Sequence, residues 1–240
     1  MPTPASNHAA LALLRADPDS AMAKYGFVVG SDVYTAGNTG GACLLSCEPL
    51  GHNIFKLTAK QGFGDYLFPY VNGTPGVGDC TVPQGQEDGT IVTTGGMNGC
   101  ALQVNRFGAN FHFYHDNNGV SIAALGIVPP GNMVARVNYK SYAGPLELGK
   151  KLAEDAFNTV NTRTTTVATT AQYQYFCLNI HVGGRWKVYY SSILETGTTT
   201  ISNTYLLGTS ILLANSVATT RSYSAFKPTI TPLITSFDDA

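Results

Sequence analysis

Residues 100–116 constrain the fold of this chain more than any other segment, because they encode a β-hairpin whose register follows from the sequence. Apolar side chains recur on both sides of a turn at Gly108-Ala109, where glycine tolerates a positive φ. A two-residue loop at this turn pairs Leu102 with His115. The segment therefore predicts two antiparallel strands with a defined set of residues on each face.

One face of the predicted hairpin combines an apolar surface with a cysteine and a histidine. Cross-strand partners share a face, and so do alternate residues along one strand. The residues of this face are Cys100, Leu102, Val104, Phe111, Phe113 and His115. Such a pattern is typical of a surface that packs on a core. Cys100 and His115 lie together at one end of it, as expected of a reactive pair at the rim.

A loop with an odd number of residues would change which histidine faces the cysteine. The pairing would shift by one residue, and the two faces of the return strand would exchange. Cys100 would then lie across from His112. The match of apolar residues favours the first register. The sequence therefore predicts His115 as the partner of Cys100 and leaves His112 as the alternative.

A cysteine and a histidine on facing strands suggest an acyl-transfer site. A free thiol has a pKa of about 8.5, and an adjacent imidazole that takes its proton supplies a thiolate able to attack a carbonyl. We therefore expect a lowered pKa at Cys100. Gly95, Gly96 and Gly99 let the backbone approach a substrate, and N–H groups near Cys100 are candidates for an oxyanion site. The alternative is that Cys100 is a buried apolar residue, as free cysteines often are.

These residues resemble a known catalytic hairpin. Gly99-Cys100, followed by Val104, Arg106 and then His115, is similar to the hairpin of the cytotoxic necrotizing factor toxins, whose motif ends in Leu-Ser-Gly-Cys and whose histidine follows at the same spacing. The related Burkholderia lethal factor has a shorter hairpin, with a spacing like that of Cys100 to His112, and a threonine at the place of Thr94. The resemblance lies within residues 94–116 and departs from the family at Met97-Asn98.

The resemblance implies both a function and a fold. The toxins of this group deamidate one glutamine of a host protein, and they are built on a β-sandwich flanked by helices. By analogy, Cys100 is the nucleophile and His115 is the base. Thr94 is our candidate for the group that orients His115, and a backbone carbonyl from residues 62–89 is an equal alternative.

Composition limits the partners of this protein. Charged residues make up 12% of the 240 residues and the formal net charge is −1, which argues against binding nucleic acid or an anionic membrane. No apolar run approaches the roughly 20 residues of a membrane span. The N-terminus lacks the basic segment of a secretory signal and predicts a short helix capped at Ser6.

The five cysteines indicate reduced thiols, not a disulfide framework. An odd number leaves at least one unpaired, and Cys43 and Cys47 are too close together in one predicted strand to form a framework. Neither a Cys-x-x-Cys pair nor a His-x-x-x-His pair occurs, so we expect no structural zinc and no cofactor. Reduced thiols are typical of a cytosol.

The whole chain, residues 1–240, predicts a single catalytic domain of mainly β structure. Helices are predicted from Asp17-Pro18 to about Gly26 and from Pro145 to Asn158. Strand-like runs fill most of the remainder, including a second hairpin with its turn at Gly183-Gly184. The expected fold class is α+β, a mainly antiparallel β-sandwich flanked by two or three helices.

Three expectations concern individual segments. Residues 62–89 are rich in Gly, Pro and Asp and predict a long loop, in which Cys80 is exposed and competes with Cys100 as the reactive thiol. Val120–Val128 predicts a buried strand. His181 lies near the tip of a predicted hairpin and is expected to be exposed.

Three functional hypotheses follow. The first is a thiol-dependent deamidase that acts as a monomer on a host protein, with the protein serving as a bacterial effector or toxin in the host cytosol. The second is another Cys-His acyl-transfer enzyme, either a protease or a transglutaminase. The third is a non-enzymatic β-sandwich that binds a carbohydrate or a protein through the aromatic residues of Phe63–Tyr70.

Overall fold

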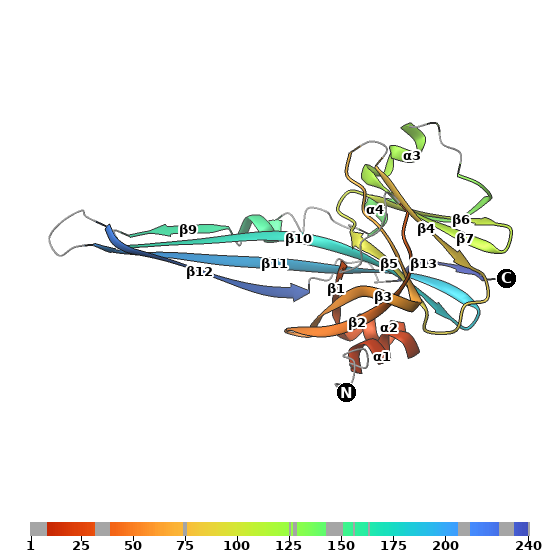
Figure 1. The fold of residues 1–240 in the computed structure, drawn as a ribbon, viewed down its shortest axis with the longest axis horizontal. Coiled ribbons are helices and arrows are strands. Elements are labelled where there is room, and N and C mark those ends of the chain that lie inside the picture. Colours follow the sequence, from red (N-terminus) through yellow and green to blue (C-terminus); the bar gives the residue numbers. More distant parts are fainter. Residues whose placement is uncertain are drawn as a thin grey trace.

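Strands dominate the fold, and helices are few (Figure 1). The computed structural model describes residues 9–31, 39–73, 76–124, 126, 129–142, 151–155, 157–162, 164–205, 212–225 and 233–239. The first elements are α1 (Ala9–Ala16) and α2 (Pro18–Lys24). The predicted start of α2 is confirmed, because the Asp17 side chain accepts the N–H of Ser20 at 3.0 Å and Pro18 lies in the first turn. The predicted cap at Ser6 lies outside the described residues.

The described strands form two sheets. They are β1 (Gly26–Ser31), β2 (Gly41–Gly51), β3 (Ile54–Phe68), β4 (Val77–Pro83), β5 (Ile91–Gly96), β6 (Ala101–Phe107), β7 (Asn110–Asp116), β8 (Asn132–Val137), β9 (Asn158–Asn161), β10 (Thr165–Val182), β11 (Arg185–Tyr205), β12 (Leu212–Ala225) and β13 (Leu233–Asp238). The larger sheet has the path β1-β3-β5-β10-β11-β12, with β2, β9 and β13 paired beside it, and the smaller has the order β4-β7-β6-β8. Pairing is antiparallel except at β1–β3 and β3–β5.

Two hydrophobic cores lie on opposite faces of the larger sheet. One core joins that sheet to α1 and α2 and includes Leu11, Leu14 and Phe176. The other joins it to the smaller sheet and includes Phe113 and Trp186. Alternate residues of a strand point to opposite faces, so β10 contributes to both cores. The result is three layers, consisting of helices, the larger sheet and the smaller sheet.

A long arm extends from this body (Figure 1). It consists of the outer parts of β10 and β11 with β12 and β9, namely residues 158–162, 164–174, 194–205 and 212–224. β10 pairs with β11 without a break, from Thr165 opposite Ser202 to Val182 opposite Arg185. β12 pairs with β11 without a break over Ala214–Ala225. The predicted hairpin with its turn at Gly183-Gly184 is thus confirmed, and its strands are longer than expected.

One short segment departs from the sequence-based expectations. Val120–Val128 was expected as a strand, but the chain forms a 3-10 turn, η2 (Asn117–Gly119), and then the helix α3 (Ser121–Ala124). The Asp116 carboxylate accepts the N–H groups of Ser121 and Ile122 at 2.7 and 3.2 Å, which favours a helix start. After this segment β8 ends at Val137, and α4 (Tyr139–Tyr142) follows.

The helix expected over Pro145–Asn158 is described only in part. Residues 151–155 are helical, residues 143–150 and 156 lie outside the described residues, and Asn158 already belongs to β9. The helix therefore ends earlier than the periodicity of its apolar residues predicts. Among the described residues, no helix has the length and apolar character that crossing a membrane requires.

The long loop expected over residues 62–89 is largely strand. β3 continues to Phe68, and positive φ values at Gly62 and Gly64 accommodate a break in its pairing with β2. β4 then pairs with β7, which places Cys80 opposite Phe113 on the core-facing side. Cys80 is fully buried, so the expectation of an exposed, competing thiol is wrong.

Candidate active site

The hairpin of β6 and β7 has the register that the sequence predicts. Leu102 pairs with His115, and Gly108 has a φ of 59° at the first position of the two-residue loop. The alternative register is wrong. His112 lies on the outer side of β7, where its Nδ1 is 3.2 Å from Oγ1 of Thr81 on β4. His115 faces the core and is fully buried.

The turn before Cys100 is anchored to β10 by the side chain of Asn98. Its Nδ2 donates to the carbonyl of Tyr173 at 2.7 Å, and its Oδ1 accepts the N–H of Tyr175 at 3.0 Å. The Asn98 side chain thereby makes two hydrogen bonds to the backbone of β10 at the point where the backbone pairing between β5 and β10 ends. Asn98 stands where the resembling family has serine, and it has a structural role here.

Two further contacts fix the backbone at Cys100. The N–H of Cys100 donates to the carbonyl of Met97 at 2.9 Å, and the hydroxyl of Tyr142 donates to the carbonyls of Met97 and Cys100, the latter at 2.8 Å. Gly99 has a φ of +82°, a conformation in which a side chain is strained. Because the N–H of Cys100 is bonded within the turn, it is not a free donor for an oxyanion.

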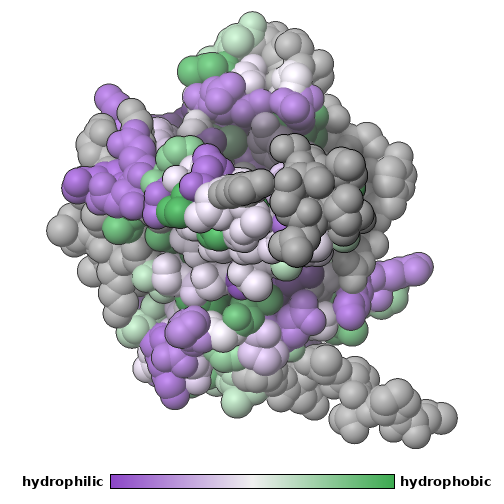
Figure 2. All heavy atoms as spheres, turned by 90° about the vertical axis from the view of Figure 1, so that its left-hand side faces the viewer, coloured by the Kyte–Doolittle hydropathy of each residue, from purple (hydrophilic) through white to green (hydrophobic). Residues whose placement is uncertain are grey.

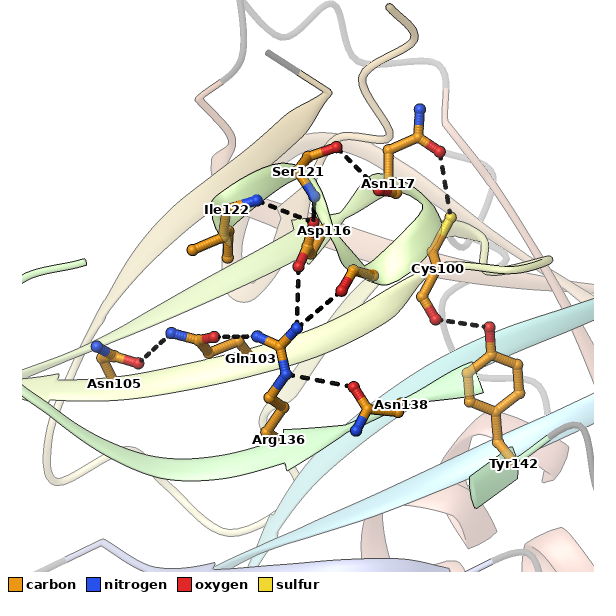
Figure 3. Close-up of polar contacts among 11 residues, drawn as sticks. Cys100, Gln103, Asn105, Asp116, Asn117, Ser121, Ile122, Arg136, Asn138 and Tyr142 are labelled. Carbon is orange, nitrogen blue, oxygen red and sulfur yellow. Dashed lines mark hydrogen bonds and ion pairs between the residues drawn. The ribbon is translucent and has the colours of Figure 1, made fainter. Parts of the chain in front are cut away.

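The Cys100 thiol is buried, at 1% exposure, and lies within reach of two oxygen acceptors, of which Figure 3 shows that of Asn117. Sγ is 3.7 Å from the carbonyl oxygen of Asn98 and 3.8 Å from Oδ1 of Asn117. Burial raises the pKa of Cys100, the N–H of Asn118 lowers it, and the charge of Asp116 raises it. The expected lowering of this pKa is therefore wrong for the resting protein, because desolvation disfavours the thiolate.

His115 has one hydrogen-bonding partner and one free ring nitrogen. Oγ1 of Thr94, which is buried on β5, lies 2.8 Å from Nδ1 of His115. Nε2 is buried and has no hydrogen-bond partner among the described residues. The rings of Tyr70 and Phe68 pack against the imidazole, with centroids 5.2 and 6.4 Å away. Burial lowers the pKa of His115 to about 4, so the imidazole is neutral at neutral pH.

The structure thus brings Thr94 and His115 into contact and places Cys100 at the start of the strand that pairs with the histidine strand. Within the described residues, Sγ makes no hydrogen bond to the imidazole. The thiol and the imidazole are both uncharged at neutral pH, because burial moves their pKa values in the directions that disfavour charge. The resting site is therefore a neutral pair, not a thiolate with an imidazolium.

A polar network behind the thiol was not predicted from the sequence (Figure 3). Nη2 of Arg136 lies 3.2 Å from Oδ2 of the buried Asp116 and donates to the carbonyl of Gly119 at 3.0 Å, while its Nη1 bonds Gln103. These bonds hold the turn that carries Asn117. The network could not be read from the local sequence, because Arg136 reaches this turn from β8.

The acid sensitivity of folding provides a test of the buried, neutral state of His115. Its pKa is about 4 when folded, compared with 6.5 as the ordinary value, so the unfolded state binds the extra proton between these pH values. Folding stability is then complete above about pH 6.5 and falls by up to about 1.4 kcal/mol per pH unit as the pH drops towards 4. His115→Gln should lose this part of the pH dependence in urea unfolding between pH 7 and 4.5.

The matched control is His112→Gln, which removes a histidine from the outer face of the same strand. This variant should keep the pH dependence of the parent. Parallel stability curves for the parent and His115→Gln would contradict the assignment of a buried neutral imidazole.

His181 does not lie exposed at its hairpin tip. It is 4% exposed, with Nδ1 3.2 Å from a carboxylate oxygen of Asp88 and Nε2 3.8 Å from one of Asp239. The expectation failed because these carboxylates come from distant parts of the chain. In the described part of the chain, no group of three His, Cys, Asp or Glu side chains is arranged to hold a metal ion.

Comparison with known proteins gives a weak structural likeness. No protein-family model matches the sequence, and no curated protein matches it. Among solved structures, the chain is similar to the C-terminal domain of CNFy, a toxin from Yersinia pseudotuberculosis, with a TM-score of 0.22 and 8% identity. The match covers 68% of this chain and 65% of that domain, so the chain spans less than two thirds of it. The geometry around Cys100 and His115 therefore carries the functional argument.

Proposed function

We propose that this protein is a thiol-dependent deamidase that converts a glutamine side chain of a target protein to glutamate. The observation that carries the proposal is the buried contact between Thr94 Oγ1 and His115 Nδ1, which leaves Nε2 without a partner on the strand beside Cys100. The resemblance of residues 94–116 to the toxin hairpin supports the same assignment. It also favours a β-sandwich arrangement of the two sheets and a host protein as the target, reached by a bacterial effector in the host cytosol.

Thr94 acts in this proposal as the positioning residue. When its hydroxyl oxygen accepts the Nδ1–H of His115, the proton of the neutral imidazole is on Nδ1, and Nε2 is available as a base. The pKa of about 4 keeps His115 in this uncharged state. Cys100 must turn from its contacts with Asn98 and Asn117 towards Nε2 before it reacts.

The reaction has two halves. The Cys100 sulfur attacks the side-chain carbonyl carbon of glutamine while Nε2 takes the thiol proton, and His115 returns that proton to the leaving ammonia. A water molecule then attacks the thioester, giving its proton to Nε2. The Cys100 sulfur leaves and recovers the proton as glutamate is released.

Asn117 and Asn118 are our candidates for stabilising the oxyanion. The backbone N–H of Asn118 is directed at the Cys100 sulfur, and the Asn117 side chain lies 3.8 Å from that atom. In Figure 3 the nitrogen of the Asn117 amide lies on the side away from the sulfur, so a modest rotation would present a donor to a substrate oxygen. These donors replace the N–H of Cys100, which is bonded within its own turn.

The decisive experiment is to incubate purified protein with host-cell lysate and examine the lysate by intact-protein mass spectrometry and isoelectric focusing. Deamidation replaces NH₂ by OH, so we expect one or a few proteins to gain about one dalton and a carboxylate that is ionised at neutral pH. Cleavage fragments would instead indicate a protease, and crosslinked ladders a transglutaminase. A lysate identical to one incubated with buffer would contradict an enzymatic function on host proteins.

A further inference from the structure

The arm has an unusual surface for a sheet that faces solvent. Within its described residues, the only charged side chains are Glu195 and Arg221, which pair with each other at 3.2 Å. Soluble surfaces usually carry roughly a quarter to a third charged residues. Threonine and serine occupy much of the arm instead, with hydroxyl contacts such as Thr199 to Thr219 at 3.2 Å. Figure 2, viewed from the arm side, shows mostly pale residues near its centre and saturated purple ones towards the edges.

The edge strand β12 lacks most of the features that normally keep a sheet edge from pairing; it carries one charged side chain, Arg221, and one register shift, at its start beside Leu212. It is the last strand on the path of the larger sheet, and Leu212 and residues 214–222 are exposed along it. It contains no lysine and no proline, and its ladder with β11 is regular over Ala214–Ala225. Natural edges are usually blunted by lysine, proline or bulges, because an open edge is a template for another strand. Val217 is 63% exposed on this strand, and Leu212 is 51% exposed.

We propose that β12 pairs antiparallel with β12 of a second copy of this chain, so that two arms join into one continuous sheet. An antiparallel strand pair around a two-fold axis brings the same surface together from both copies. With the axis at Ala218, this residue lies opposite its own copy, Val217 lies opposite Thr219 of the partner, and Arg221 lies opposite asparagine. No like charges meet. This dimer is independent of the deamidase proposal and departs from the monomer expected from the sequence.

Charge favours a second copy over a foreign partner. Arg221 is already paired within its own arm by Glu195, so β12 presents no free charge by which to select a foreign strand. A neutral edge that meets no repulsion from its own copy is self-complementary. The area that such an interface would bury is also adequate. Fourteen residues at about 3.4 Å each, over a sheet roughly 10 Å thick, bury about 1,000 Å² in total, at the lower limit for a specific interface.

Sedimentation equilibrium across a micromolar concentration series tests the proposal. We expect the parent chain to reach twice its 25.4 kDa mass, and the variant Leu212→Lys/Val217→Lys to remain monomeric at the same concentrations. The control is Val120→Lys/Met133→Lys, which adds the same charge at two residues that are each 59% exposed and lie outside the arm. This control should dimerise like the parent. Far-UV circular dichroism confirms that each variant is folded.

Cysteine crosslinking tests the register separately. Single cysteines at residues 217–220 are each oxidised alone, because the residue on the two-fold axis lies opposite its own copy, and opposed Cα atoms about 4.5–5.5 Å apart are within disulfide range. The five native cysteines are buried and give a low background. We expect a covalent dimer from the single cysteine at position 218, which lies on the axis. A parent chain that stays monomeric, a dimer that survives Leu212→Lys/Val217→Lys, or a complete lack of crosslinks would overturn the proposal.

Discussion

Cys100→Ala is expected to abolish modification of the target protein, lowering its rate by about 10³-fold or more, as loss of a catalytic nucleophile does in comparable enzymes. The deamidation that we propose begins with a bond from this sulfur. Alanine cannot form that bond. The measurement is the rate at which the target acquires its acidic form in isoelectric focusing.

Cys47→Ala is the matched control for this loss. Cys47 is also a buried thiol, at 3% exposure, but it lies in the core between the helices and the larger sheet. Its replacement removes a sulfur of similar burial, so the activity should stay close to that of the parent when both proteins are assayed under conditions in which they are fully folded. Retention of more than a tenth of the parent rate by Cys100→Ala would remove the thiol from the mechanism.

Local patterns were sufficient to predict the hairpin. The turn at Gly108-Ala109 and the alternation of apolar residues both act within residues 100–116, so the sequence specifies the pairing of Leu102 with His115 without help from the rest of the chain. The contact of Thr94 with His115 was a positional hypothesis, and the structure places the two side chains 2.8 Å apart. Their catalytic roles remain predictions.

Features that depend on distant residues could not be predicted. The pKa of Cys100 was expected to fall because a histidine faces it on the neighbouring strand, whereas the surrounding core buries the thiol and raises its pKa. His181 was expected to be exposed because it lies near a hairpin tip, and its partners Asp88 and Asp239 are remote in sequence. The ion pair between Arg136 and Asp116, which holds the turn beside the thiol, was not predicted because the two residues lie on different strands and are distant in sequence.

Asp65 is the clearest case of a residue whose importance only the three-dimensional structure reveals. It is fully buried on β3, where the pairing of β2 with β3 is interrupted. Its two carboxylate oxygens bond Arg15 of α1 at 2.7 and 2.6 Å. They also accept the N–H groups of Leu45 on β2 and Ile91 on β5, at 3.1 and 3.0 Å. One side chain therefore joins four elements on the helix-covered side of the larger sheet.

Asp65→Ala is expected to cost about 3–5 kcal/mol of folding stability, because it leaves a partly buried cation without its counter-ion and two buried N–H groups without an acceptor. That loss is a large part of the roughly 5–15 kcal/mol by which most domains are stable. The measurement is the midpoint of urea unfolding at an unchanged slope. Asp65→Ala/Arg15→Met should recover part of the loss, since it removes the uncompensated charge but not the unpaired N–H groups.

Glu48→Ala is the control, because it removes a carboxylate from an ion pair with Lys56 on the same two strands, β2 and β3. The Glu48 and Lys56 side chains are 59% and 38% exposed, so solvent screens their attraction, and the expected cost is at most about 1 kcal/mol. The difference between the two variants isolates the effect of burial, since both lose one carboxylate. If Asp65→Ala unfolds at the same urea concentration as Glu48→Ala, the four-element junction does not stabilise the fold. The hydrogen bonds of Asp65 would then contribute no more than those of a solvated surface pair.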